Sequence, residues 1–587
     1  MFRSQIARIL SCVAVISLAV PVPVQAKYVG GIIEDSALHH PVIGRFGMVA
    51  SQNDLASRVG AEVLANGGNA VDAAVAVGYA LSVTLPRAGN IGGGGFMMAY
   101  LADEDRTVAI DFREMSPEKA YRDMYLDENG DVDRHKSWFS HHASGVPGTV
   151  AGLEYARKKF GSKSRKALLK PAIDLAENGF PMTVFLADGL ESVRGRMAPH
   201  KASMSKFFKK DGASYEPGEM FRQPLLAKTL KRISDKGEKE FYKGETAKLI
   251  VADQEAHGGM LSMKDMAAYK VIERPIVEGT YRGHKVVSMP PPSSGGVHII
   301  QMLNVLEHFD LKSMGSNSAD FIHTVSEVTK RAYADRSEHL GDPDFYNVPV
   351  AWLTDPAYAR DLASSIDPHA ATPSAKIKAS KAPAYESPDT THFSVMDAKG
   401  NAVVVTYTLN FSYGNSIVVP GGGFLMNNEM DDFSAKAGVP NEYGLIGGVA
   451  NAIEPYKRPL SSMTPTIVFK AGKPYLLTGS PGGSRIITSV LQVILNVVDH
   501  GMNVADAGAT PRFHHQWQPD EIRVERGFSA DTIAELERRG HTVNVKPSMG
   551  STQSIVYDGH YFYGASDPRR RNAGAIGICI KGEVGGC

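Results

Sequence analysis

The chain has 587 residues, with 63 basic and 63 acidic side chains, and 43% of its residues are hydrophobic. The balanced charge gives no electrostatic basis for binding nucleic acid or an anionic membrane surface. The hydrophobic content is enough for a large core, and no Gly/Ser-rich linker, low-complexity tract or internal repeat marks a domain boundary.

The first 26 residues have the features of an export signal. Arg3 and Arg8 precede an apolar run over residues 9–20, and residues 24–26 supply small side chains before a signal-peptidase cut. An uncleaved anchor is the alternative, but the run is shorter than the ~20 residues that a membrane span needs. We therefore expect an exported, periplasmic protein that begins near Lys27 and has no membrane span.

The region before residue 390 mixes helices and strands. Apolar periodicity predicts helices over residues 54–64 and 71–77, a strand over residues 107–112, and mostly helical structure over residues 149–340. Arg113 ends the predicted strand, where an arginine can be either a solvated ion-pair partner or a bidentate clamp on a carboxylate. This order of elements favours α+β layers.

Residues 390–408 predict a β-hairpin. Two β-rich runs are separated by turn residues at 397–401. Folding the chain about Lys399 places Thr390 opposite Thr408, with their Cβ atoms roughly 4.5–5.5 Å apart. A one-residue slip would turn every side chain to the other face, so the register is a hypothesis.

Thr390 has two interpretations. A β-branched residue at the start of a strand is ordinarily a good strand former. If the peptide bond between Asp389 and Thr390 is cut, the threonine gains a free α-amino group, and one residue then carries both a hydroxyl nucleophile and its base. The hairpin alone favours the structural interpretation.

A second hairpin is predicted over residues 464–478, followed by a helix over residues 484–495. Its simplest register pairs Ser461 with Gly482. Gly482 and Gly483 must form a tight turn before the helix. The turn would also expose backbone N–H groups at the positive end of the helix dipole, which suits a developing oxyanion.

Ten short segments, five before residue 390 and five from residue 390 onward, match the motifs of one family in order. They are residues 66–73, 92–96, 111–114, 145–148, 290–296, 390–394, 407–410, 427–433, 458–463 and 479–485. Through them the chain resembles the γ-glutamyltranspeptidases, which are self-cleaving N-terminal-nucleophile hydrolases. The resemblance covers essentially the whole mature chain.

The resemblance implies a fold and a processing step. The expected fold is α+β, a four-layer αββα sandwich of the N-terminal-nucleophile hydrolase type. Cleavage between Asp389 and Thr390 would give a large subunit, residues 27–389, and a small subunit, residues 390–587. The two would form one composite unit as a heterodimer, with no cofactor or metal.

The resemblance also assigns catalytic roles by position. Thr390 is the expected nucleophile for both maturation and turnover, and Thr408 is expected to orient it through a hydroxyl hydrogen bond. Thr408 could instead form an ordinary cross-strand threonine pair. Gly482 and Gly483 are expected to supply oxyanion-hole N–H groups.

Further positions are expected to hold the substrate. The resemblance implies that Arg113, Ser461 and Ser462 bind its α-carboxylate. It implies that Asn410 and Asp432 bind its α-amino group, with Glu429 beside them. It also places Tyr443 in a lid over residues 436–448. Asp432 could alternatively be a cap or a surface acid. Position alone does not separate these interpretations.

The resemblance implies transfer of a γ-glutamyl group from glutathione, or another γ-glutamyl amide, to water, an amino acid or a peptide. The intermediate would be an ester on Thr390. Two alternatives remain at this point: a related acylase that acts on a cephalosporin or glutaryl amide, and a non-catalytic exported binding protein with the same fold.

The cysteines, the histidine pairs and a run of arginines give weaker evidence about function. Cys579 and Cys587 could form a disulfide or remain two thiols. The histidine pairs at 39–40, 141–142 and 514–515 lack metal-site spacing. Residues 569–571, three arginines, suggest a surface or intersubunit charge run.

Overall fold

The computed structural model describes residues 37–377, 390–436 and 448–587. The predicted export signal, Asp389 and Tyr443 lie outside the described residues. None of the helices in the described part of the chain has the length and apolarity that crossing a bilayer requires.

The described residues contain two seven-stranded antiparallel sheets. Sheet I has the order β19-β2-β10-β11-β3-β4-β7, and sheet II has the order β1-β18-β17-β13-β12-β9-β8. The strands of sheet I are β19 (Gly574–Gly577), β2 (Gly47–Ser51), β10 (Thr391–Asp397), β11 (Ala402–Thr408), β3 (Gly94–Leu101), β4 (Arg106–Phe112) and β7 (Ile272–Arg274). The strands of sheet II are β1 (Val42–Gly44), β18 (Phe562–Ser566), β17 (Gln553–Tyr557), β13 (Lys473–Thr478), β12 (Thr466–Lys470), β9 (His284–Ser288) and β8 (Val277–Tyr281).

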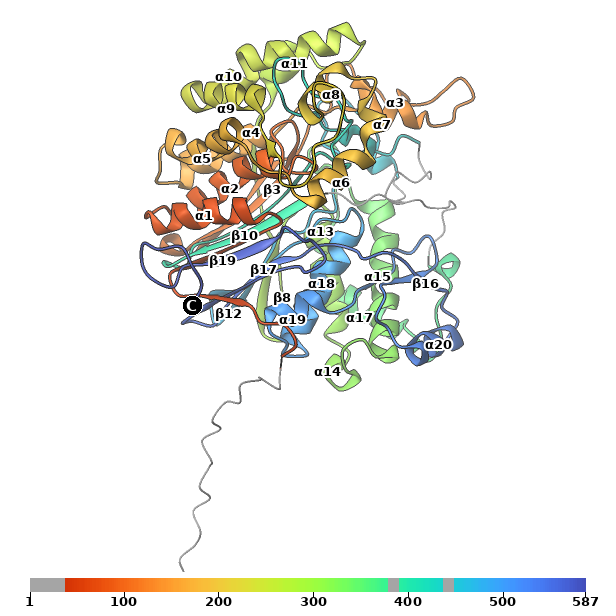
Figure 1. Ribbon diagram of the computed structural model, residues 1–587. Coiled ribbons are helices and arrows are strands. Elements are labelled where there is room, and N and C mark those ends of the chain that lie inside the picture. The colour runs from red at the N-terminus through yellow and green to blue at the C-terminus, as the bar shows by residue number, and fades with distance from the viewer. Residues whose placement is uncertain (1–36, 378–389, 437–447) are drawn as a thin grey trace, which may run out of the picture. The chain divides into compact units, whose positions relative to one another are not determined.

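Helices cover the outer face of each sheet, as Figure 1 shows. Sheet I is covered by α1 (Asp54–Ala65), α2 (Ala70–Thr84), α4 (Thr149–Phe160), α5 (Arg165–Asn178) and α9 (Pro224–Lys236). Sheet II is covered by α13 (Gly295–Leu306), α15 (Ala319–His339) and α18 (Arg485–Val498). The result is the expected α+β fold, a four-layer αββα sandwich.

The sandwich has two cores because neighbouring residues of a strand point to opposite faces. In β2, Val49 belongs to the core between sheet I and its helices, whereas Met48 and Ala50 belong to the core that includes both sheets and the helices of sheet II. Every residue of β10 and β11 is buried, as expected for central strands covered on both faces.

Shorter elements complete the described chain. The helices are α3 (Arg134–Phe139), α6 (Val184–Ser192), α7 (Arg194–Met197), α8 (Lys201–Phe207), α10 (Glu238–Lys243), α11 (Glu245–Ala256), α12 (Met263–Ala268), α14 (Leu311–Met314), α16 (Val350–Leu353), α17 (Pro356–Ser364), α19 (Val504–Ala509) and α20 (Ala530–Arg538). The 3-10 turns used below are η2 (His141–Ala143) and η4 (Glu429–Asp432). Two small sheets are β14 (Phe513–His514), β15 (Ile522–Val524) and β16 (Val543–Val545), and β5 (Phe180–Pro181) with β6 (Met220–Phe221).

The local predictions are confirmed before residue 390 and in the first hairpin. Helices α1 and α2 and strand β4 lie where apolar periodicity placed them. In the first hairpin, Thr391 pairs with Tyr407 and Val395 with Val403, which is the predicted register. Extending that register by one residue places Thr390 beside Thr408.

The predicted register of the second hairpin is wrong beyond its turn. Lys470 pairs with Lys473 as expected, but a bulge at Tyr475 shifts the outer pairs by one residue. The bulge adjoins Pro474, which has no N–H for the ladder. Ser461 therefore does not pair with Gly482; it lies beside Ser293 and donates its backbone N–H to a neighbouring proline carbonyl at 2.8 Å.

The two cysteines in the described part of the chain are joined. Cys579 and Cys587 form a disulfide with a Cα–Cα distance of 5.0 Å. This decides the question that the sequence left open in favour of a bond, which closes a small loop after β19.

Candidate active site

Thr390 lies directly before β10 and is only 6% exposed. Its Oγ1 lies 3.4 Å from Thr408 Oγ1, within reach of a hydroxyl contact although longer than the usual distance. Thr408 is itself held in place, because its Oγ1 accepts the N–H of Asn410 at 2.8 Å and its carbonyl accepts from Asn90 at 2.8 Å. Two central strands thus bring the threonine hydroxyls together.

A cavity of about 20 Å³ adjoins Thr390. A space of this size holds about one water molecule. The residues that line the cavity are Arg113, Arg336, Thr390, Thr408, Asn410, Glu429, Asp432, Ser461, Ser462, Met463, Gly483 and Ile486. The structure therefore gathers nine of the residues singled out from the sequence, which are spread over 371 positions, around one point.

Arg113 is fully buried directly after β4 and is not a solvated ion-pair partner. Its Nη1 contacts Glu429 and its Nη2 contacts Asp432, while its Nε donates to a backbone carbonyl at 3.2 Å. These contacts raise the pKa of Arg113 against the opposing effect of burial. Asp432 is accordingly a partner of a buried arginine, neither a helix cap nor an isolated surface acid.

Glu114 adds a third carboxyl beside Arg113. Its Oε2 lies 3.6 Å from Nη1 of Arg113. Burial raises the pKa of Glu114 to about 7 and raises that of Glu429 well above its ordinary value. A single proton shared by these two acids removes the repulsion between two buried carboxylates.

Replacing Glu114 with glutamine should change how stability depends on pH. The folded protein holds the Glu114 proton more tightly than the unfolded chain does, so this stability is fully present below pH about 4.5 and is lost as pH rises through about 7. Glutamine keeps the neutral form. Glu114→Gln should therefore melt at a higher temperature than the unmodified protein at pH 8, with a difference that shrinks toward pH 5.

Scanning calorimetry across this pH range measures the difference. Glu118→Gln is the matched control, because Glu118 is exposed and its lysine partner lowers the pKa of its carboxyl. That variant should show no such trend. A melting difference for Glu114→Gln that stays constant with pH would contradict the shared proton.

Asn410 follows β11 in a left-handed backbone conformation, with φ at 73°. Asparagine tolerates this region better than most residues do. The conformation lets its backbone N–H reach Thr408 Oγ1 while its side-chain amide donates to the carbonyl of Asn428 at 3.0 Å. One residue thereby links the nucleophile strand pair to the segment that carries Glu429 and Asp432.

Arg336 is a cavity residue that the sequence analysis missed. It comes from α15, and its Nε and Nη2 donate to Ser294 Oγ at 3.0 Å and to Ser462 Oγ at 3.1 Å. Burial lowers the pKa of Arg336 to about 10, which leaves the guanidinium charged at neutral pH. No motif marks it, because an arginine in a long helix usually points to solvent.

Gly482 and Gly483 lead into α18 with φ at 135° and 54°, in the region that favours glycine. Their carbonyls accept from the N–H groups of Arg485 and Ile486 at 3.1 and 3.2 Å. Within the described part of the chain, no group accepts a hydrogen bond from the N–H of either glycine. Gly483 lines the cavity beside Thr390, whereas Gly482 lies one residue behind it.

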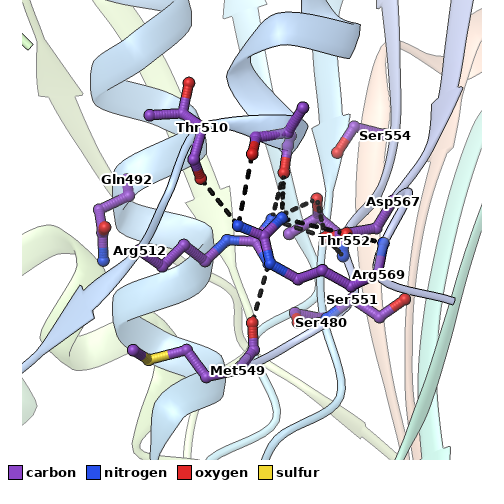
Figure 2. A network of polar contacts seen from close by, with 12 residues as sticks. Ser480, Gln492, Thr510, Arg512, Met549, Ser551, Thr552, Ser554, Asp567 and Arg569 are labelled. Atoms are coloured by element: carbon purple, nitrogen blue, oxygen red, sulfur yellow. Dashed lines mark hydrogen bonds and ion pairs between the residues drawn. The ribbon is translucent and has the colours of Figure 1, made fainter. Parts of the chain in front are cut away.

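The segment that packs against this turn belongs to a buried polar network around Arg512 and Arg569, and Figure 2 shows this network. A Cβ on Gly482 would lie 3.6 Å from the Cα of Gly550. The segment around Gly550 is fixed by Arg512, which donates to the carbonyl of Met549 at 2.9 Å and to Asp567 at 2.7 Å. These hydrogen bonds therefore hold in place the segment against which the turn packs.

Arg569 belongs to the same network, so the predicted surface run is wrong for this residue. Its Nη1 donates to the carbonyl of Gly508 and its Nη2 to that of Thr510, both at 2.9 Å, while its Nε donates to Glu525 at 2.9 Å. Because Arg569 is the first of three consecutive arginines, its side chain was predicted to be exposed. Its guanidinium instead binds backbone carbonyls at the end of α19.

Comparisons with known proteins identify the family of this chain. The family model described as gamma-glutamyltranspeptidase matches residues 56–577. The chain is 53% identical over 569 residues to the glutathione hydrolase proenzyme of Escherichia coli (strain K12), with 97% of each chain covered.

Solved structures support the fold. The cephalosporin acylase from Bacillus halodurans has a TM-score of 0.79 at 25% identity and covers 93% of this chain and 99% of its own. The γ-glutamyltranspeptidase of Helicobacter pylori has a TM-score of 0.55 at 45% identity and covers 59% of this chain and 97% of its own. The sandwich is that of N-terminal-nucleophile hydrolases, and the chain belongs to the γ-glutamyltranspeptidase family.

Proposed function

We propose that this protein is a self-cleaving γ-glutamyltransferase and glutathione hydrolase. It transfers the γ-glutamyl group of glutathione and related amides to water, amino acids or peptides. One observation carries the proposal. Thr390 lines the same small cavity as the buried Arg113, its partners Glu429 and Asp432, and Gly483. That set matches a nucleophile, the recognition of an amino-acid head group and an oxyanion donor.

Maturation begins with attack of Thr390 Oγ1 on the carbonyl carbon of Asp389. The peptide nitrogen leaves the carbon as the ester forms, takes up a proton and becomes the α-amine of Thr390. Water then hydrolyses the ester, which regenerates the Thr390 hydroxyl and frees the carboxylate of Asp389. An α-amine has a typical pKa near 7.7–8.0, so at neutral pH a useful fraction can accept the hydroxyl proton. Thr408 orients the hydroxyl.

Turnover repeats this chemistry on a γ-glutamyl amide. Thr390 Oγ1 attacks the γ-carbonyl, the amine leaves with the proton, and the γ-glutamyl ester remains on Thr390. The N–H groups of Gly482 and Gly483 stabilise the negative charge that develops on the carbonyl oxygen. Water or an amine then attacks the ester, which releases glutamate or a new γ-glutamyl compound.

Charge complementarity defines the donor. Arg113, Ser461 and Ser462 bind the substrate's α-carboxylate, and Asn410, Glu429 and Asp432 bind its α-amino group. In the closed cavity Arg113 already contacts Glu429 and Asp432. Substrate binding therefore exchanges these contacts for contacts with the head group.

The location and subunit composition follow from the sequence. Residues 1–26 direct export to the periplasm, and cleavage gives a heterodimer of residues 27–389 and 390–587. Both the name proenzyme carried by the Escherichia coli relative and the 59% of this chain that the Helicobacter pylori chain covers are consistent with two subunits from one precursor.

An acylase of the same superfamily is the second candidate, because the Bacillus halodurans cephalosporin acylase shares the fold. A glutaryl amide differs from a γ-glutamyl amide only in lacking the α-amino group. The buried acids beside Arg113 favour a substrate with that group. When Arg113 binds the substrate's α-carboxylate, the acids need another cationic partner, because an unpaired acid is costly to bury.

The test compares both substrates on the purified mature protein. Intact mass should show two chains, residues 27–389 and 390–587, and γ-glutamyl-p-nitroanilide should be cleaved far faster than glutaryl-p-nitroanilide. Preference for the glutaryl amide would make the protein an acylase. A single uncleaved chain with full transferase activity would overturn the Thr390 mechanism.

A further inference from the structure

Three potential metal ligands meet far from Thr390 in the sequence. His141 lies in η2, Asp253 lies in the last turn of α11, and His257 follows the end of that helix. One nitrogen from each histidine and one oxygen of Asp253 all lie within 4.8 Å of one another. His141 and Asp253 are 112 residues apart along the chain, which explains why the spacing of neighbouring histidines did not predict the cluster.

The spacing of these atoms fits a small transition-metal ion. His141 Nε2 lies 3.1 Å from Asp253 Oδ2, and His257 Nδ1 lies 3.4 Å from Asp253 Oδ1. Two ligands of tetrahedral zinc, each about 2.0–2.1 Å from the metal, lie about 3.3 Å apart. A metal among these groups therefore needs small movements of the side chains.

A third histidine adjoins the cluster. The ring of His200 lies 6.3 Å from that of His141 in an edge-to-face arrangement. Neutral imidazole is the form that binds zinc, and three nitrogen ligands with one carboxylate are typical of that metal.

We propose that His141, Asp253 and His257 bind one Zn²⁺ ion, with His200 or a water molecule as the fourth ligand. The rings of His141 and His257 now stack 4.4 Å apart and nearly parallel. Both nitrogens can reach one ion if the ring of His257 tilts. It has room to do so, since its side chain is 55% exposed.

The metal would connect α11 to the edge of the active site. Three residues after His141, Ser144 donates its hydroxyl to the carbonyl of Asn427 at 2.8 Å, and the N–H of Gly145 donates to Asn427 Oδ1 at 2.9 Å. Asn427 begins the segment that carries Glu429 and Asp432. The role is therefore structural: the ion fixes η2 and, through it, this segment.

Titration of the metal-free mature enzyme, purified without a histidine tag, with ZnCl₂ tests the site. Calorimetry should show one strong equivalent per heterodimer, and the melting temperature should rise with zinc concentration. His257→Ala should weaken binding at least ~10-fold and abolish the rise in melting temperature. Its exposed position should leave folding and zinc-free activity unchanged.

His369→Ala is the matched control, because His369 is exposed and far from the cluster in sequence; it should bind zinc as the unmodified enzyme does. Asp253→Asn provides a second loss of a ligand and should also weaken binding. The proposal is overturned if the unmodified enzyme binds no zinc, or if it and His257→Ala bind zinc equally. Neither result would bear on the chemistry of γ-glutamyl transfer, because none of the four proposed ligand residues lines the cavity beside Thr390.

Discussion

Replacement of Thr390 by alanine should leave a single uncleaved chain and reduce γ-glutamyl transfer by at least about 10⁴-fold. Alanine removes the oxygen that forms both esters, and without cleavage no α-amine exists to act as base. Alanine also fits the backbone and burial of a central strand, so the fold should persist. Intact mass and hydrolysis of γ-glutamyl-p-nitroanilide measure the two losses separately.

Replacement of Thr390 by serine tests the role of the hydroxyl separately from that of the threonine methyl group. Thr390→Ser keeps the nucleophile and should still be cleaved before residue 390, with residual activity well above that of Thr390→Ala. Thr408→Val complements it by removing only the orienting hydroxyl, and should slow cleavage without preventing it. If Thr390→Ala were cut at the same bond and remained active, the nucleophile would have to be another residue.

The first hairpin could be predicted in register because its turn determines it. Residues 397–401 leave one sensible fold-back point, and a central strand pair without a bulge carries that register unchanged to Thr390 and Thr408. The second hairpin has the same kind of turn, yet its register shifts at Tyr475. A bulge depends on how the whole sheet twists, so the local amino-acid sequence does not predict it.

Long-range contacts account for most of what the sequence did not show. Arg113 could be recognised because it sits in a family motif at a strand end. Arg336 could not, since only the packing of α15 against the segment at Ser462 brings it to the cavity. The zinc ligands show the same limit, because η2 and α11 meet only in the folded chain. Local patterns thus predict elements better than they predict buried polar partners.

Replacement of Arg113 by lysine should lower kcat/KM for γ-glutamyl-p-nitroanilide roughly 100-fold, mainly through KM. The guanidinium contacts Glu429 and Asp432 with separate nitrogens, and an ammonium group cannot reproduce that fork. Loss of one contact in a buried charged network costs about 2–5 kcal/mol, and each 1.4 kcal/mol corresponds to a factor of ten. Lysine keeps the positive charge, which limits the damage to the fold.

Asp432→Asn shows which end of the head group each residue holds. A glutaryl amide keeps the carboxylate and lacks the α-amino group, so Arg113→Lys should weaken the hydrolysis of both substrates. Asp432→Asn removes the negative charge that faces the ammonium and should weaken only the γ-glutamyl substrate. The ratio of kcat/KM between the two substrates should therefore fall in Asp432→Asn and stay nearly constant in Arg113→Lys. The reverse pattern would exchange the two assignments, and an unchanged ratio in both variants would mean that the acids around Arg113 stabilise the protein without recognising the α-amino group.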